Sequence, residues 1–391
     1  MIGLTLLIAA ILALPVVITA FFALEVLTGL ARLQDFPSEP DRRLSVVIVI
    51  PAHDEEAVIH RTVAETLVNA PEGFAVLVVA DNCNDATGER ARSAGAVVVV
   101  RDDPDNRGKG FALAFAREHL RSDPPDVVVV LDADCCIDPK SLRGLVASIE
   151  DNGRPAQAVN LLAPDLAASP LVQLSTFAFM IKNLIRQRGL QRLAGRAHLT
   201  GTGMALPWDL FASANLGGSN IVEDLALGLE LANHAAAPKL VSRATVWSPA
   251  ASESGTLVQR SRWEGGYLAT ALKTVPAALA RSLRQGDTRG FLAALDLSVP
   301  PLALLVLINI AALLVALVGV FAGAAVWPMI VQLVVGAVAL FAIGLAWIGE
   351  GRRFASAGTL LRLPFYVIWK IPMYVGLARR GVPKEWLRTG R

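Results

Sequence analysis

Long uncharged stretches near both ends of the chain enclose a region of short apolar runs that end in polar residues. Residues 1–24 carry no charge before Glu25, and residues 297–349 carry none between Asp296 and Glu350. A helix needs roughly 20 apolar residues to span a bilayer. The first stretch therefore predicts one spanning helix, and the second stretch is long enough for two.

The turn between the paired helices is expected around Gly323, Trp327 and Pro328, with Trp327 at a membrane interface. The first stretch has an alternative interpretation as a cleaved signal peptide. It lacks a basic start, however, and its apolar run is longer than the roughly 7–15 residues typical of such peptides. We therefore favour a membrane anchor.

Basic residues cluster after the uncharged stretches: Arg32, Arg42, Arg43, Arg352, Arg353, Arg379, Arg380, Lys384, Arg388 and Arg391. Lys and Arg are enriched on the cytoplasmic side of membrane proteins, and three crossings place all these residues on that side. The sequence thus predicts an integral protein of the inner or plasma membrane. Its N-terminus is expected outside, and residues 31–296 and the C-terminus are expected in the cytoplasm.

Two further segments are apolar but less suited to crossing a membrane. Tyr267–Arg284 mixes Leu and Ala with basic residues, and is expected either on the inner membrane surface or as a helix packed on the soluble domain. Leu363–Ala378 is short, contains Pro364 and Pro372, and carries Lys370. We expect it to form an interfacial or re-entrant helix.

The region between the membrane segments has the pattern of an α/β domain. Apolar, β-branched runs occur at Ser45–Ile50, Val76–Ala80, Val97–Val100 and Val127–Leu131. Helices are expected between them, at residues 55–70 and 86–94, and from the end of a loop that includes residues 107–110 to Leu120. Continuous apolar strands separated by helices indicate a mostly parallel sheet that is covered on both faces. Ligands bind such sheets at the carboxyl ends of the strands.

Composition supports a membrane protein and argues against some other classes. The chain of 391 residues is 54% hydrophobic and 18% charged, with a mean hydropathy of +0.51. A net charge of only +2 gives no reason to expect nucleic acid as a partner. Cys83, Cys135 and Cys136 have neither metal-type spacing nor a disulfide pattern, so free thiols are expected.

Acidic residues follow the predicted strands. Asp132 and Asp134 come directly after Val127–Leu131, and residues i and i+2 of an extended segment point to the same side. Their carboxylates would suit Mg²⁺ or Mn²⁺, which leave positions open for substrate phosphates. The alternative is a solvated turn with acidic caps. Asp81 ends the second strand, where it can accept hydrogen bonds from the base or ribose of a nucleotide.

Two other positions have both a functional and an ordinary explanation. Lys109 lies between two glycines and can reach a phosphate as a point charge, or it is a surface-loop lysine. Glu223 and Asp224 open a helical run, Val222–Ala232. One of these acids can be the general base that deprotonates an acceptor hydroxyl. Alternatively, both are partners of the helix dipole.

The segment Gln259-Arg260-Ser261-Arg262-Trp263 completes a series of motifs. Together with Asp54/Glu55, Asp81, Asp132/Asp134 and Glu223-Asp224, in this order, it resembles the pattern of family 2 glycosyltransferases of the GT-A fold. The resemblance covers about residues 45–270. The flanking apolar helices are similar to those of the membrane-integrated branch, which includes cellulose synthase, hyaluronan synthase and ceramide glucosyltransferase.

The resemblance implies a role for each motif. Asp134, with Asp132, binds Mg²⁺ or Mn²⁺, and Asp224 is the catalytic base of an inverting transfer. The donor contacts are Pro51, Glu55, Asp81, Lys109, Asp132, Gln259, Arg262 and Trp263. The acceptor side comprises Gly201, Thr202, Gly203, Glu223 and Trp263. Leu171–Arg188 is expected to be a helix that contacts the acceptor or packs in the core.

The expected substrates are a nucleotide-diphosphate sugar, UDP-linked by default, and a membrane lipid or lipid-linked saccharide. A processive polysaccharide synthase, acting as an oligomer or with an accessory subunit, is the main alternative. A regulatory module with an inactive domain and a nucleotidyltransferase are less well supported. A nucleotidyltransferase is expected to have a Gly-rich phosphate-binding loop after its first strand. At that position this chain has Pro51-Ala52-His53-Asp54-Glu55.

These patterns predict five regions along the chain. They are an anchor helix at 1–30, a cytoplasmic catalytic domain at 31–266, an amphipathic interfacial segment at 267–295, a spanning pair at 296–350, and a basic C-terminal region at 351–391.

Overall fold

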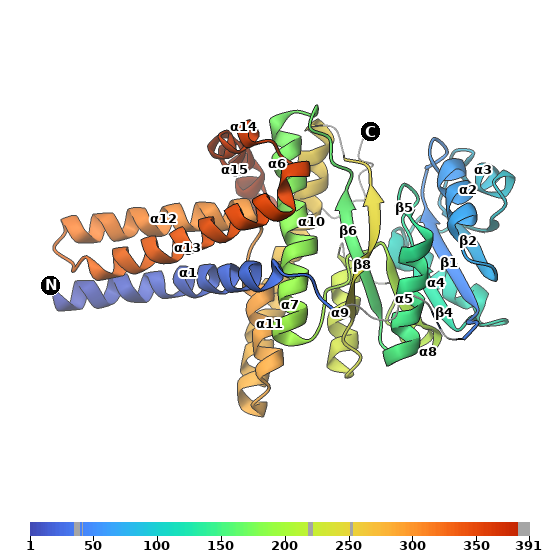
Figure 1. The fold of residues 1–391 in the computed structure, drawn as a ribbon, viewed down its shortest axis with the longest axis horizontal. Helices are drawn as coiled ribbons and strands as arrows, with labels where there is room; N and C mark the ends of the chain where they lie inside the picture. The colour runs from blue at the N-terminus through green and yellow to red at the C-terminus, as the bar shows by residue number, and fades with distance from the viewer. Residues whose placement is uncertain (35–39, 41, 218–221, 251–252, 382–391) are drawn as a thin grey trace.

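The computed structural model describes residues 1–34, 40, 42–217, 222–250 and 253–381. Figure 1 shows three parts along its long axis. Apolar helices project at one end, a layer of helices runs across their direction, and an α/β domain with its sheet lies at the other end.

The sheet has eight strands in the order β3-β2-β1-β4-β7-β6-β8-β5. The strands are β1 (Val46–Ala52), β2 (Phe74–Asp81), β3 (Val97–Arg101), β4 (Val127–Val130), β5 (Cys136–Ile137), β6 (Ala156–Leu162), β7 (Met204–Pro207) and β8 (Lys239–Ser248). The first four are parallel, as predicted. Strand β7 is antiparallel to both β4 and β6, and β5 is antiparallel to β8, so the complete sheet is mixed.

Helices cover both faces of the sheet because alternate strand residues point to opposite sides. The helices are α2 (Ile59–Asn69), α3 (Thr87–Ser93), α4 (Lys109–Leu120), α5 (Pro139–Asn152), α8 (Trp208–Ser213) and α9 (Glu223–Asn233). Ile48 and Ile50 of β1 share a core with Leu142 of α5. Val49, between them, packs into a second core with Leu113 of α4.

Helix α2 begins four residues later than predicted. Asp54 adopts a left-handed backbone conformation with φ of 52°, which is incompatible with a helix at that point. The amide of Glu55 donates to Thr87 Oγ1 at 2.8 Å, and a turn then leads to Ile59. The segment after β1 is therefore a loop at the sheet edge.

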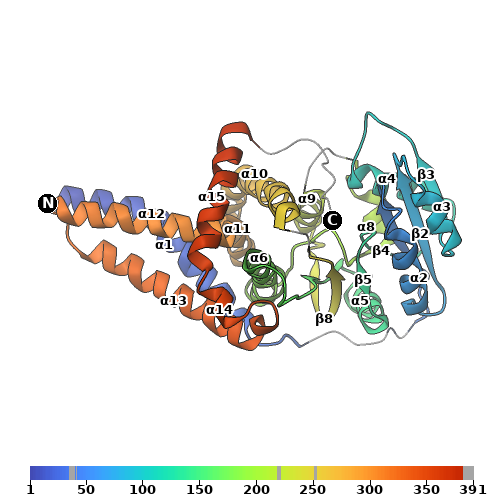
Figure 2. The same cartoon turned by 90° about the horizontal axis from the view of Figure 1, so that it is seen from above.

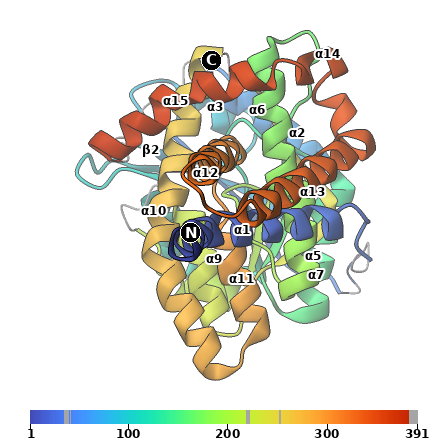
Figure 3. The same cartoon turned by 90° about the vertical axis from the view of Figure 1, so that its left-hand side faces the viewer.

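Three helices are long and apolar enough to cross a membrane in the described part of the chain. They are α1 (Ile2–Gly29), α12 (Leu302–Phe321) and α13 (Trp327–Gly349), and they lie side by side (Figures 1 and 3). A polar chain links all three. Asn309 donates to Thr19 Oγ1 at 2.9 Å, and Gln332 donates to Asn309 Oδ1 at 2.7 Å.

The middle layer comprises helices that run across the direction of the apolar three (Figures 2 and 3). One continuous helical rod contains α6 (Pro170–Met180), the π-helix η1 (Ile181–Arg186) and α7 (Gln187–Ala194). The others are α10 (Glu253–Gln285), α11 (Thr288–Ser298) and α15 (Leu363–Arg380), with the short η2 (Gly351–Arg353) and α14 (Ala357–Leu360). The predicted region boundary at residue 266 falls within α10, because no residue there interrupts the helix.

Helix α15 has one face packed on the protein and one exposed apolar face. Lys370 pairs with Glu264 of α10, and Tyr366 is buried beside it. Phe365 and Ile368 are 70% and 60% exposed. Helix α15 is unbroken at Pro372 and lies across the apolar helices, an orientation compatible with the predicted interfacial helix.

Helix α1 crosses the η1–α7 rod at two glycines without room for a side chain. A methyl group at Gly29 would overlap the carbonyl oxygen of Ile185, and one at Gly189 would overlap the carbonyl oxygen of Glu25. The two backbones therefore touch, which fixes α1 against the η1–α7 rod.

We expect Gly29→Ala to destabilise the protein by about 1–3 kcal/mol, because the added methyl group forces the two helices apart. The measurement is thermal unfolding in mild detergent. Gly3→Ala in the same helix is the matched control, since nothing lies within 4 Å of its added methyl group. Equal melting temperatures for the two variants would contradict the close crossing.

Candidate active site

One large cavity, with a volume of about 920 Å³, connects the strand ends to the helices next to the three long apolar helices. Pro51, Asp81 and Asp132 line it at the sheet edge. Phe22 of α1 and Leu302 of α12 line its other end. Polar side chains at the sheet edge and apolar side chains near the predicted membrane-spanning helices therefore line the same cavity.

Most of the predicted site residues meet in this cavity: Pro51, Glu55, Asp81, Lys109, Asp132, Asp134, Gly201, Glu223, Asp224, Gln259, Arg262 and Trp263. Thr202 and Gly203 do not line it. Thr202 Oγ1 instead accepts the amide of Asp132 at 3.1 Å, and Gly203 donates to the carbonyl of Val130 at 2.9 Å. These two residues thus support the cavity wall behind Asp132.

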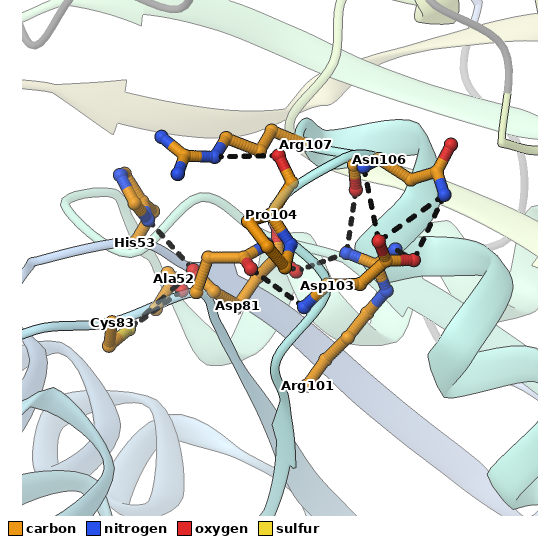
Figure 4. Close-up of polar contacts among 10 residues, drawn as sticks. Ala52, His53, Asp81, Cys83, Arg101, Asp103, Pro104, Asn106 and Arg107 are labelled. Atoms are coloured by element: carbon orange, nitrogen blue, oxygen red, sulfur yellow. Dashed lines mark hydrogen bonds and ion pairs between the residues drawn. The ribbon is translucent and has the colours of Figure 1, made fainter.

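Asp81 is held rigidly at the end of β2 (Figure 4). Its Oδ1 accepts from Arg101 at 2.7 Å and from Asn82 at 3.0 Å, and its side chain is 3% exposed. His53 Nδ1 lies 2.7 Å from the Asp81 carbonyl oxygen. Arg101 also donates to Asp103 and to the carbonyl of Asn106, so one guanidinium organises the loop after β3.

Sequence analysis missed Arg101, although a signal was present. Arg101 directly follows the valine run of β3, and it is the register partner of Asp81 on the neighbouring parallel strand. Two oppositely charged residues that end adjacent parallel strands meet at the same edge. That pairing required the strand register, which the sequence alone did not provide.

Asp132 and Asp134 form a group that can hold a metal ion. Ligand atoms of these two residues and of Cys135 all lie within 4.8 Å of one another. Burial raises the pKa of the Cys135 thiol well above its usual value, and its Sγ lies 3.0 Å from Ser248 Oγ. The donors that remain are carboxylate oxygens, which Mg²⁺ and Mn²⁺ prefer.

Lys109 lies at the centre of the acidic groups. Its Nζ pairs with Asp132 and donates to the carbonyl of Gly201 at 2.7 Å. Burial opposes its charge, but Asp132 and Glu223 raise its pKa above the ordinary lysine value. Gly201 has φ of 85°, and a methyl group there would lie 3.2 Å from Asp224 Oδ2 and 3.5 Å from Lys109 Nζ. A glycine therefore lets Asp224 and Lys109 approach the same loop.

Glu223 and Asp224 form the first turn of α9, as predicted. Burial raises the pKa of Glu223 to about 7, and the charge of Asp224 adds to this shift. Burial also raises the pKa of Asp224, while the amide of Leu225, at 2.8 Å, and Lys109 oppose the shift. Carboxylates with raised pKa values are better proton acceptors near neutral pH.

The Gln259–Trp263 motif occupies the N-terminal part of α10. Arg260, which sequence analysis did not assign to the site, is 6% exposed. It donates twice to Ser175 at 2.9 Å, and its guanidinium lies 4.9 and 5.4 Å from the ring centres of Phe179 and Trp263, which are themselves 5.5 Å apart. Arg260 thus fixes Trp263 against α6. Arg262, two residues later on the same helix, is less buried than Arg260 and also lines the cavity. Burial lowers the pKa of Arg262.

The sequence profile of a family described as "Glycosyltransferase like family 2" matches residues 42–266, more than half of the chain. The chain belongs to this glycosyltransferase family. The matched range contains every predicted site residue, and it ends inside α10, three residues beyond Trp263.

Two curated relatives and one solved structure illustrate the range of this glycosyltransferase's neighbours. Low-salt glycan biosynthesis hexosyltransferase Agl6 of Haloferax volcanii is 30% identical over 111 residues, which is 28% of this chain and 25% of the relative. Probable glycosyltransferase YdaM of Bacillus subtilis is 27% identical over 246 residues, 58% of this chain and 56% of the relative. The matches thus span about a quarter and about half of those proteins.

The solved structure is mannosyltransferase PcManGT from Pyrobaculum calidifontis in complex with GDP-Man and Mn²⁺. It has a TM-score of 0.54 and 15% sequence identity, and the alignment covers 96% of this chain and 98% of that chain. This likeness supports the GT-A-type fold of the glycosyltransferase over nearly its whole length.

We expect Arg260→Lys to lower the transfer rate at least about tenfold, equivalent to about 1.4 kcal/mol. Lysine keeps the charge but loses the planar contact with Trp263 and one hydrogen bond to Ser175. The measurement is initial-rate kinetics of sugar transfer. Arg281→Lys, an exposed position on the same helix, is the control. Wild-type rates in Arg260→Lys would mean that Trp263 does not depend on the guanidinium.

Proposed function

We propose that the protein transfers a hexosyl group from a nucleotide-diphosphate sugar to a lipid or lipid-linked saccharide in the membrane, with inversion at the anomeric carbon. The observation that carries this proposal is the continuity of the cavity. Asp224 lines the same cavity as the carboxylates of the sheet edge and the residues that begin α12, so donor and lipid can meet at one base.

The donor half is assigned to the sheet edge. Asp81 and Glu55 would bind the nucleoside, and Arg262 would bind the diphosphate through its forked N–H donors. A divalent metal on Asp132 and Asp134 would neutralise the diphosphate. The presence of Mn²⁺ in the mannosyltransferase structure and the oxygen donors of this pair support that choice.

In the proposed reaction, Asp224 removes the proton of the acceptor hydroxyl. The freed oxygen attacks the anomeric carbon on the side opposite the diphosphate, and the bond from that carbon to the phosphate oxygen breaks. One bond forms as one breaks, so the configuration inverts. Lys109 moves no proton; its charge holds Asp132 and the loop of Gly201 beside the base.

The acceptor half is assigned to the far end of the cavity. Phe22, Pro301 and Leu302 line it with apolar surface near the ends of α1 and α12, which suits lipid chains better than a soluble acceptor. We infer that α1, α12 and α13 cross the membrane with the N-terminus outside. Helices α10, α11 and α15 would then lie along the cytoplasmic surface, in keeping with the exposed Phe365 and Ile368.

The proposal is tested with the purified full chain, Mn²⁺, a panel of UDP- and GDP-hexoses and total membrane lipid. Nucleotide release from one donor, dependent on lipid and lost with EDTA, is expected, with a product one hexose heavier. A long polymer would favour a processive synthase instead. Release that does not depend on lipid would contradict the lipid acceptor.

We expect Asp224→Asn to abolish transfer while leaving nucleotide binding within about twofold, because the variant removes only the proton acceptor. Rates and equilibrium nucleotide binding are measured separately. Glu230→Gln, two turns later in α9, is the matched control and should transfer normally. Transfer by Asp224→Asn at the wild-type rate would rule out this base.

The pH profile should report the carboxylate pair. Glu223, with a pKa of about 7, gains a proton first as pH falls, which removes a negative charge beside Asp224 and makes it a weaker base. Asp224 is protonated at lower pH, yet above the usual aspartate range, and activity is then lost. We expect two acid steps in kcat/KM at saturating Mn²⁺. Glu223→Gln should retain only the lower step; an unchanged profile in that variant would contradict the assignment.

A further inference from the structure

The acidic side chains on the membrane side of the cavity already have cationic partners. Glu264 pairs with Lys370 and accepts from Tyr374 at 2.7 Å. Asp296 pairs with Arg186 at 2.7 Å and with His198. These carboxylates are neutralised within the protein and need no further cation.

Lys182 lines the same part of the cavity and differs from these residues. Its side chain is exposed to the cavity, and Nζ lies 4.8 Å from the centre of the Tyr267 ring. It forms no ion pair or hydrogen bond with any residue in the described ranges. Burial lowers its pKa; the charge of Asp224 opposes this shift, whereas the charges of Arg186 and Arg260 add to it.

Asn183 provides a second, independent observation. It is only 3% exposed. Its side-chain amide forms no hydrogen bond with the residues that the structure describes, and the residue lines the cavity. A ligand in the cavity can therefore supply the missing hydrogen-bond partner. A neighbouring cation and amide, both directed at one space, form an incomplete binding site.

The local helix geometry explains why both side chains reach the cavity. Lys182 and Asn183 belong to the π-helix η1, which interrupts the rod between α6 and α7. A π-helical turn is wider than an α-helical one, and such segments occur frequently at functional sites. Arg186 in the same segment also lines the cavity, but it already forms an ion pair with Asp296.

The pair lines the same cavity as Asp224 and the first residues of α12. Lys182 Nζ lies over the ring of Tyr267, 4.8 Å from its centre. The Tyr267 hydroxyl lies 3.1 Å from the carbonyl oxygens of Leu297 and Val299, just before α12 begins. A group bound by Lys182 would therefore belong to the acceptor rather than to the donor nucleotide.

We propose that Lys182 and Asn183 bind a phosphate on the acceptor, so that the acceptor is an anionic lipid whose accepting hydroxyl lies near a phosphate. Neutral hydroxyl lipids are then poor acceptors. This inference rests on the proposed function, which it deepens by naming the acceptor class. The phosphate offsets the unpaired positive charge and supplies acceptor oxygens for the Asn183 amide.

A binding measurement tests the site without requiring catalysis. Labelled dodecyl phosphate is titrated into the full chain in non-ionic detergent, with dodecanol as the neutral competitor. We expect saturable binding that dodecanol does not displace. Lys182→Met should weaken it at least tenfold, Lys182→Arg should retain most of it, and Asn183→Asp should weaken it by placing a carboxylate beside the lysine. Lys273→Met, exposed on α10, is the matched control.

Transfer kinetics provide the second readout. Dodecyl phosphate should compete with the lipid acceptor, and Lys182→Met should raise the acceptor KM at least tenfold with nucleotide binding unchanged. Equal binding of dodecyl phosphate to the wild type and Lys182→Met would overturn the inference, as would equal use of neutral and phosphate-bearing lipids. If lipid-dependent nucleotide release is absent altogether, the proposed function fails, and the binding titration still decides the fate of the phosphate site.

Discussion

The arrangement of the whole molecule depends on a buried charge network between α1 and the middle layer of helices. Glu25 of α1 is fully buried and accepts from Arg186 Nε at 2.8 Å, and Arg186 Nη2 donates to Asp296 Oδ1 at 2.7 Å. Removing one partner of such a group leaves an uncompensated buried charge, at a cost of about 3–5 kcal/mol. Helix α1, the π-helix and α11 are therefore held together as one unit. The glycine crossing at Gly29 and Gly189 brings the backbones close enough for these contacts.

This network also shapes the cavity. Burial opposes the charge of Asp296, but His198 and Arg186 hold its pKa below the usual range, so it remains an ionised anchor for α11. The Tyr267 hydroxyl of α10 lies within hydrogen-bonding distance of backbone carbonyls at the end of α11 and just beyond it. Helices that are far apart in the sequence thus line one cavity, which Asp224, the proposed base, also lines.

The sequence predicted local features well and long-range ones poorly. The valine-rich strands and the acids that follow them, such as Asp81 and Asp132, were predictable because one short pattern encodes both a strand and its end. The antiparallel β7 and the partners of Glu25 were not predicted, since each depends on contacts with residues more than 70 positions away. Arg260 lies inside a recognised motif, yet its stacking on Phe179 required the packing of α10 on α6.

Charge pairing distinguishes the two halves of the cavity. At the sheet edge, ligand atoms of Asp132 and Asp134 share a small volume, and oxygen ligands of this kind suit a divalent cation. At the end near α12, Glu264 and Asp296 are each paired with a cationic residue, and Lys182 adds a further positive charge. Under the proposed function, a metal would neutralise the donor diphosphate at the first end, and Lys182 would attract an anionic acceptor at the second. Both substrates would then occupy the single cavity that Asp224 lines.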